Sequence, residues 1–328
     1  MSEEPLSFAA LKCLHLVNTL LCSGRQTSMC ADHFRVPILS TAFVFVLSVF
    51  VGGTVRGQQP CTATLAPSIP TAVNIFSIQQ ERTLGDIEAE WVDENYHAGN
   101  SAGLAAHLNT IAGRVLAQFP GDPMPVHVIL IDTPEAESFS IGPERIYVTR
   151  KMVTLLRNDD ELAGLLGHEL GHILTHQNAI MVSRLFHAIL GVDVVSDRTD
   201  ILEKLRRMLD SIDRDTKSLR KAAEIIERQE GIDQNKADQV ALYASAAAGF
   251  SPQSYLELFK RSAGINGSNG SVLTDYFGAT TSNLRRLREI QRVLRQLPRP
   301  CREITPAVSV EFRTWQAEVM SATDLTRR

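Results

Sequence analysis

Residues 159–174 have the sequence DDELAGLLGHELGHIL, and this stretch decides most of the fold and the chemistry. Its apolar residues recur at the spacing of a largely buried α-helix. Acidic residues at its start suit the positive end of a helix dipole, and Asp159 and Asp160 are the predicted N-cap positions. Inside the helix lies His168-Glu169-Leu170-Gly171-His172, which is an HExxH motif.

The two histidines of this motif are predicted zinc ligands. Positions i and i+4 lie on one face of a helix, so His168 and His172 can bind the same ion. Glu169 can then reach a zinc-bound water and act as its general base. The alternative is a pair of core histidines that happen to be four residues apart, but the helical context favours the metal site.

The composition is that of an ordinary globular protein and argues against nucleic-acid binding. Hydrophobic residues make up 44% of the chain and charged residues 21%, as in most soluble domains. A formal net charge of -4 gives no basic excess, and 6% aromatic residues provide few platforms for bases. We therefore expect no nucleic acid as a partner; the oligomeric state is not predicted.

Residues 1–57 are predicted to be an N-terminal extension carrying a signal peptide or a membrane anchor. The segment 36–55 contains no charged residue and follows Arg35. Cleavage near Gly53 or Gly57 would make it a secretory signal, whereas retention would leave an anchor long enough to span a bilayer. Both alternatives predict an exported protein, periplasmic or otherwise extracytoplasmic, and the second adds membrane association.

Two of the five cysteines, Cys61 and Cys301, would remain after such cleavage. An oxidising compartment permits a disulfide that ties the N-terminal segment to the C-terminal part of the chain. The alternative is two unpaired thiols in flexible ends. The sequence leaves both alternatives open.

The remaining chain predicts a mostly helical α+β protein. An apolar run at 126–131 and a Gly142-Pro143 turn within 138–149 predict a small antiparallel sheet next to the motif helix. A long charged helical stretch is expected over 200–229, as a solvated face or as a lid or partner-binding element. Residues 58–74 form a predicted linker. Helical spacing predicts further helices over 76–91, 104–119, 151–157, 232–248 and 252–260, and a basic amphipathic helix over 284–297.

Several segments together resemble the zinc peptidase family that includes the CAAX prenyl proteases, HtpX, the mitochondrial Oma-type proteases and BepA. The segments are Gln79-Gln80-Glu81 with Leu84-Gly85, Ser138-Phe139 with Ile146-Tyr147-Val148-Thr149, Asp160 to His172 with His176, and Ala237-Asp238 with Ala248-Gly249-Phe250-Ser251-Pro252. The resemblance implies a zincin-like metallopeptidase domain over residues 75–300 and leaves 301–328 as a C-terminal tail. It also implies that Zn²⁺ is the cofactor.

The resemblance assigns the third zinc ligand to a glutamate four residues before Asp238, and this chain has Gln234 there. A neutral amide oxygen binds zinc more weakly than a carboxylate, so the zinc affinity should be lower. Asp238 is expected to hydrogen-bond a zinc histidine and fix its tautomer. The alternatives are that Glu230, Asp233 or Asp238 itself binds the metal, or that Asp238 is a surface carboxylate. His176 is expected at a helix end and not as a fourth ligand.

Three glycines at 164, 167 and 171 are expected to form a flat strip against the alanine-bearing helix at 237–248, bringing Gln234 to the histidines. The His-Pro pair that many family members carry is missing from 278–287, where Arg285 or Arg286 could approach the site instead. The donor to the transition-state oxyanion is therefore unassigned.

The motif and the resemblance together imply a zinc-dependent endopeptidase. The resemblance and the predicted signal also imply that its protein or peptide substrates are envelope or misfolded proteins. Residues 138–140 are the candidate edge strand for binding substrate by strand addition. The alternative is a catalytically weak or inactive relative that acts as a chaperone-like binding module, because Gln234 replaces the expected glutamate.

Overall fold

The computed structural model describes residues 61–62, 72–99, 101–119, 125–133, 136–262 and 283–325. The predictions for 1–57, for most of the 58–74 linker and for the missing His-Pro pair before 283 lie outside these residues.

The helices are α2 (Ile78–Asn95), α3 (Ala102–Leu116), α4 (Arg150–Leu155), α5 (Asp159–Leu174), α6 (Gln177–Leu185), the π-helix η1 (Phe186–Leu190), α7 (Arg198–Arg214), α8 (Thr216–Ala247), α9 (Pro252–Ser262), α10 (Asn283–Gln296), α11 (Arg299–Arg302) and α12 (Val310–Leu325).

The described residues confirm a mostly helical α+β fold with one four-stranded sheet. The strands are β1 (His97–Ala98), β2 (His127–Asp132), β3 (Ser138–Ile141) and β4 (Arg145–Thr149), in the order β1-β2-β4-β3. The expectation of an entirely antiparallel sheet was wrong, because β2 pairs in parallel with β4. The β3–β4 hairpin enters with β3 at the edge, so its returning strand β4 lies beside β2 and runs in the same direction.

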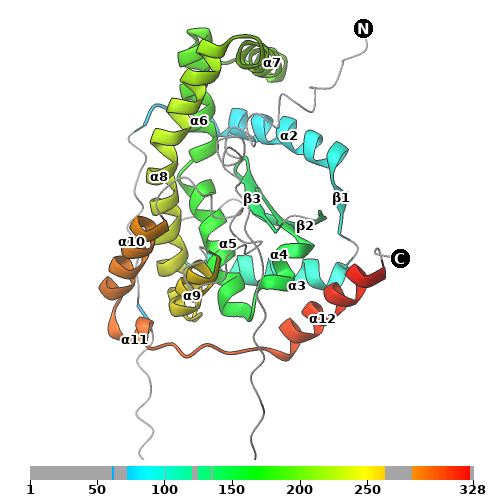
Figure 1. Cartoon of the computed structure of the whole chain (residues 1–328), viewed down its shortest axis with the longest axis vertical. Coiled ribbons are helices and arrows are strands. Elements are labelled where there is room, and N and C mark those ends of the chain that lie inside the picture. Colours follow the sequence, from blue (N-terminus) through cyan, green and yellow to red (C-terminus); the bar gives the residue numbers. More distant parts are fainter. Residues whose placement is uncertain are drawn as a thin grey trace, which may run out of the picture.

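Side-chain alternation along the strands gives the sheet two buried faces. Val128 and Leu130 of β2 and Val148 of β4 belong to the main core with α3 and α5. Tyr147 of β4 instead packs with Trp91 of α2. Figure 1 shows the sheet between α2 and α3 accordingly. Successive strand residues point to opposite faces, so one face of the sheet packs on α3 and α5 and the other packs on α2. The strand β3 contacts the motif helix α5.

The N-cap of the motif helix α5 lies one residue before the two predicted candidates, Asp159 and Asp160. This residue is Asn158, whose Oδ1 accepts from the Glu161 backbone N–H at 2.8 Å. Asp159 and Asp160 lie in the first turn, where Asp160 is free to accept from the Ser251 and Ala307 backbone N–H groups at 2.5 and 2.9 Å. These bonds fix the start of α5 relative to the C-terminal part of the chain.

The charged stretch predicted over 200–229 is divided at a different point. The break falls at Asp215, whose carboxylate caps the Lys217 and Ser218 N–H groups and starts α8. From there α8 continues without interruption through the predicted boundary near 230 and ends at Ala247. A side-chain cap of this kind decides a helix start more strongly than the charge pattern does. As a result, one helix of 32 residues runs the length of the molecule beside α5 (Figure 1).

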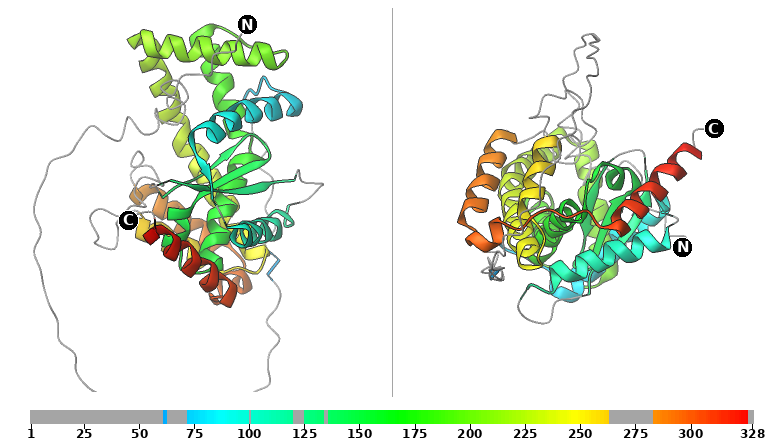
Figure 2. Two further views of the ribbon diagram at one scale, coloured as in Figure 1. Left: turned by 90° about the vertical axis from the view of Figure 1, so that its right-hand side faces the viewer. Right: turned by 90° about the horizontal axis from the view of Figure 1, so that it is seen from below.

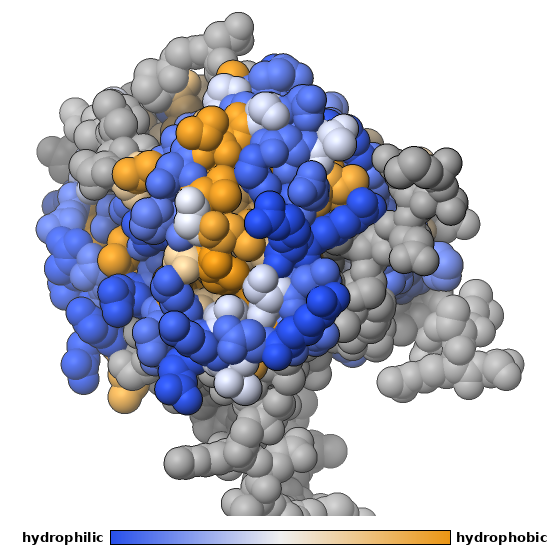
Figure 3. Space-filling view, turned by 90° about the horizontal axis from the view of Figure 1, so that it is seen from above, coloured by the Kyte–Doolittle hydropathy of each residue, from blue (hydrophilic) through white to orange (hydrophobic). Residues whose placement is uncertain are grey.

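The upper end of the molecule has a hydrophobic core of its own. Residues of α2, α6, η1, α7 and α8 form it, including Phe186, Leu205 and Met208. Viewed from this end, apolar residues form a band between hydrophilic ones (Figure 3). Within the part of the chain that the structure describes, no helix combines the length and the apolar character needed to cross a membrane.

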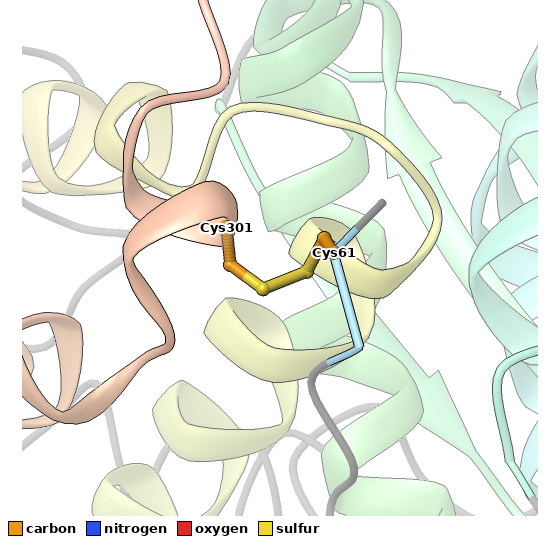
Figure 4. Close-up of a disulfide and its surroundings, with 2 residues drawn as sticks. All are labelled: Cys61 and Cys301. Atoms are coloured by element: carbon orange, nitrogen blue, oxygen red, sulfur yellow. A yellow bond between two sulfur atoms is a disulfide. The ribbon is translucent and has the colours of Figure 1, made fainter. Parts of the chain in front are cut away.

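The C-terminal residues are attached to the domain by a helix and by a disulfide. Phe312 and Val319 of α12 are buried in the main core, so the segment predicted as a tail contributes to the packing. Cys61 is bonded to Cys301 in α11, with a Cα–Cα distance of 4.7 Å across a sequence separation of 240 (Figure 4). The chain before the domain is therefore fixed to its C-terminal part.

Candidate active site

The two motif histidines face each other on one side of α5. Their Nε2 atoms are 3.1 Å apart and their ring planes are nearly perpendicular, at 86°. Two imidazoles on one tetrahedral zinc, with Zn–N bonds of about 2.0–2.1 Å, would have their nitrogens roughly 3.4 Å apart. The spacing of His168 and His172 therefore fits a single metal ion.

The other ring nitrogen of each histidine is engaged by a hydrogen-bonding partner. His168 Nδ1 lies 3.0 Å from Asp238 Oδ1 and 3.0 Å from the Tyr255 hydroxyl. His172 Nδ1 contacts Gln177 Oε1. An acceptor at Nδ1 keeps the proton there and leaves the Nε2 lone pair for a metal.

His172 is held in the neutral form that a metal requires. Burial lowers the pKa of its imidazole to about 4, and the positive charge that His168 can carry acts in the same direction. A neutral imidazole is the metal-binding form, so no proton must be displaced from His172 near neutral pH.

Asp238 lies at the centre of a buried ionic network. Burial alone would raise the pKa of its carboxyl, but the Arg286 guanidinium beside it holds that pKa well below its usual range. Arg286 binds both oxygens, from Nε to Oδ2 at 2.7 Å and from an Nη atom to Oδ1 at 2.6 Å. Tyr255 also donates to Oδ1, at 2.5 Å. Two arginines were candidates from the sequence. Arg286 is buried and forms the ion pair with Asp238, whereas Arg285 is exposed.

Glu169, the predicted general base, is buried and points to the edge of the sheet. Its Oε1 accepts a hydrogen bond of 2.7 Å from Ser138 Oγ, in the first residue of β3. The predicted substrate-binding segment 138–140 is thus part of an edge strand, and it touches the motif helix at the carboxylate. A peptide that paired with β3 would lie next to Glu169.

The two helices that carry the site approach each other backbone to backbone. A Cβ atom added at Gly171 would lie 2.6 Å from the Ala237 Cα, and one added at Gly167 would lie 3.0 Å from the Ala241 Cα. The predicted glycine strip is therefore present at these two positions. Gly164 instead accommodates the Tyr255 side chain, because α9 crosses α5 there.

Gln234 lies one turn before Asp238 on α8, and His172 lies one turn after His168 on α5. Because α5 and α8 run antiparallel and Asp238 contacts His168, we expect Gln234 at the level of His172. Gln234 is half-buried.

The alternative metal ligands considered from the sequence have other partners. Asp238 faces Nδ1 of His168, and Asp233 accepts a hydrogen bond from Gln229 at 2.7 Å. No third His, Cys, Asp or Glu completes a metal cluster among the described residues, and the Glu230 side chain lies outside them.

His176 is turned away from the two histidines. It adopts a left-handed backbone conformation with φ of 53° between α5 and α6, and its Nδ1 lies 2.8 Å from Glu81 Oε2. This sharp turn returns the chain so that the next residue, Gln177, reaches both His172 and the Asp233 carbonyl at 3.1 Å. His176 thus orients the segment that supports the site.

Sequence reasoning missed three participants: Gln177, Tyr255 and the hydroxyl of Ser138 as the partner of Glu169. Ser138 was identified only as part of an edge strand. Tyr255 lies three residues after Pro252 in a helix with no other sign of function, and only the crossing of α9 over Gly164 brings it to His168. No pattern in the sequence signals that contact.

The structure thus brings together a buried HExxH pair, an edge strand and a histidine supported by a carboxylate. The chain belongs to peptidase family M48, whose sequence model matches residues 100–294. Peptidases of this family are generally zinc metalloproteases. The match runs from α3 into α10 and thus includes both helices that carry the candidate site.

Two curated relatives have protease names. A "Protease HtpX homolog" of Campylobacter curvus is 34% identical over 145 residues, which cover 42% of this chain and 46% of the relative. A "Beta-barrel assembly-enhancing protease" of Yersinia pestis is 22% identical over 139 residues, which cover 42% of this chain and 28% of the relative. The chain thus spans less than half of the length of either protein.

Proposed function

We propose that this protein is a zinc-dependent endopeptidase with Glu169 as general base. The observation that carries the proposal is the pair of Nε2 atoms 3.1 Å apart, with Glu169 on the same helix and next to an edge strand. His168 and His172 would hold the ion, with Gln234 as the third protein donor. A bound zinc ion would acidify a water molecule and polarise the scissile carbonyl.

The residues of the chain itself would perform the remaining steps. The edge strand β3 would bind the substrate backbone by strand addition and orient the scissile bond. Glu169 would accept the proton of the attacking water on a carboxylate oxygen and pass it to the leaving amine. Ser138, which donates to Oε1, would keep that carboxylate in one orientation.

Substrates and location are inferred from the chain outside the site. The uncharged segment 36–55 supports export, with cleavage of a signal or retention as an anchor. The Cys61–Cys301 disulfide is in keeping with an oxidising compartment, such as the periplasm or another extracytoplasmic space. We therefore propose envelope or misfolded proteins as substrates.

The alternative function is a chaperone-like binding module with little or no catalysis. The specific observation in its favour is the neutral Gln234 in the position expected for a charged ligand. A site with one negative charge fewer should hold zinc less tightly. Unfolded proteins would then bind along β3 without being cleaved.

Zinc content and casein cleavage, measured on the same preparations, test both functions. The native chain should hold one zinc and cleave casein, Glu169→Gln should hold zinc without cleaving, and Gln234→Glu should hold zinc more tightly. Glu90→Gln is the matched control, because Glu90 is an exposed glutamate of α2 far from the motif. A native chain that is metal-free and inert, but that gains zinc on Gln234→Glu, would establish the binding module instead.

A further inference from the structure

The exposed residues of α10 and α11 include a series of arginines that the candidate site does not use. The buried face of α10 consists of Leu287, Ile290 and Val293, which belong to the main core. On the opposite, exposed face of α10 an arginine recurs at every third or fourth residue, and the same sequence spacing continues into α11. We call these residues the arginine stripe. It consists of Arg285, Arg288, Arg292, Arg295, Arg299 and Arg302, all exposed.

The charge of this stripe is largely uncompensated. Glu289 pairs with Arg292, and Glu303 pairs with Arg299 at 2.7 Å. Within the part of the chain that the structure describes, the other four arginines of the stripe form no ion pair. The six arginines of the stripe, less Glu289 and Glu303, give this face a formal charge of +4 within a chain of net charge -4. The rest of the chain therefore carries -8, and attraction for an anionic partner is concentrated on this face.

The disulfide ties the arginine stripe to the apolar N-terminal segment. Cys301 lies between Arg299 and Arg302, and it is bonded to Cys61 (Figure 4). Only six peptide links separate Cys61 from residue 55, where the uncharged segment ends. Six links of extended chain reach at most about 20 Å. Any membrane that holds 36–55 therefore also comes within reach of the stripe.

We propose that the arginine stripe binds the anionic headgroups of a lipid bilayer and docks the domain on the membrane surface. Guanidinium groups bind phosphate oxygens with two parallel hydrogen bonds, which suits phospholipid headgroups. The two helices that carry the stripe, α10 and α11, lie at the outer edge of the molecule, on the side opposite α12 (Figure 2, right). It contains no aromatic side chain on which bases could stack, so a nucleic acid is the less suitable polyanion.

Arginine footprinting on vesicles tests the proposal with the full chain. The chain is bound to vesicles of phosphatidylcholine alone or with 30% phosphatidylglycerol, and phenylglyoxal modification is followed residue by residue. Phenylglyoxal should modify the stripe arginines at least about fivefold more slowly on the anionic vesicles than on phosphatidylcholine alone. Addition of 0.5 M NaCl should abolish this protection. Arg207, Arg214 and Arg220, exposed at the α7 end, are the internal reference and should react equally on both.

A matched pair of variants isolates the stripe. Each basic residue near an anionic surface strengthens binding about fivefold, so Arg288, Arg292 and Arg295 all changed to Gln should weaken docking about 100-fold. Protection of the remaining stripe arginines should then disappear, whereas Gln at the three reference positions should preserve it. Arg286 is left unchanged because it pairs with Asp238. If the variant does not fold, the footprint of the native chain still decides.

Three results would overturn the proposal. Equal modification on both kinds of vesicle would mean that the headgroups are not bound. Protection by soluble polyglutamate, but not by anionic vesicles, would assign the stripe to an acidic protein. Protection by a single-stranded oligonucleotide, but not by the vesicles, would assign it to a nucleic acid.

Discussion

Glu88 is a buried carboxyl whose titration should make the stability of this protein depend on pH. The residue is 7% exposed in α2, and Asn178 Nδ2 donates to its Oε2 at 2.7 Å. Burial raises the pKa of Glu88 to about 7, and the hydrogen bond from Asn178 opposes this only in part. In the unfolded chain the same carboxyl has a pKa near 4.5.

The direction of the effect follows from which state binds the proton more tightly. The folded state does, so the protonated carboxyl stabilises the fold relative to the ionised one. This contribution is complete below about pH 4.5, decreases as the pH rises, and is lost above about pH 7. At about 1.4 kcal/mol per pKa unit, ionisation of Glu88 lowers the free energy of unfolding by roughly 3 kcal/mol.

Glu88→Gln removes the titration but retains an oxygen that can accept from Asn178. Urea unfolding with the disulfide intact should give equal stabilities for the variant and the native chain at pH 4, below the pKa of the carboxyl in either state. At pH 8 the variant should be more stable by roughly 3 kcal/mol. Glu90→Gln is the control on the exposed side of α2, and it should change the stability by less than about 1 kcal/mol at either pH. Parallel pH profiles for Glu88→Gln and the native chain would refute the reasoning.

Four further predictions concern the site and the disulfide. Tyr255→Phe removes the hydrogen bond to Asp238 and should weaken zinc binding about 10- to 100-fold in a chelator competition; an unchanged affinity would remove Tyr255 from the site. Ser138→Ala should lower kcat for casein about tenfold at constant zinc content, and Ser138→Thr should restore it; a loss in KM alone would contradict the orienting role. Gly171→Ala forces α5 and α8 apart and should cost about 1–3 kcal/mol in urea unfolding together with zinc; a fully stable variant would disprove the close contact. Cys301→Ser should destabilise the chain by roughly 5 kcal/mol, and the native chain should match it in the presence of a reductant; insensitivity to the reductant would argue against the bond.

The sequence predicted the elements whose signals are local. Periodicity found the motif helix, α3 and the β3–β4 hairpin, and the Gly-Pro turn placed the hairpin correctly because Gly142 has a positive φ of 55°. The parallel pairing of β2 with β4 could not be predicted in this way. It depends on where a distant hairpin inserts into the sheet, and alternation along each strand is the same for either direction.

In the candidate site too, the sequence predicted the residues of one helix but not the contacts between helices. His168, Glu169 and His172 follow from one helix and its period. Their supporting contacts come from α6, α8, α9 and α10, and each depends on how those helices pack around α5 and α8. The buried Arg286 and the exposed Arg285 are neighbours with the same chemistry, so only packing distinguishes them.

The glycine contact between α5 and α8 has a consequence for how this site can change over evolution. Backbone distance, rather than adjustable side chains, sets the gap between the helices at Gly171 and Gly167. Substitutions at those glycines alter the scaffold, whereas the half-buried position 234 can exchange Gln for Glu, which has nearly the same size, without rebuilding it. Under the proposed zinc mechanism, a single codon change at that position would separate a weak peptidase from a strong one while the architecture stays intact.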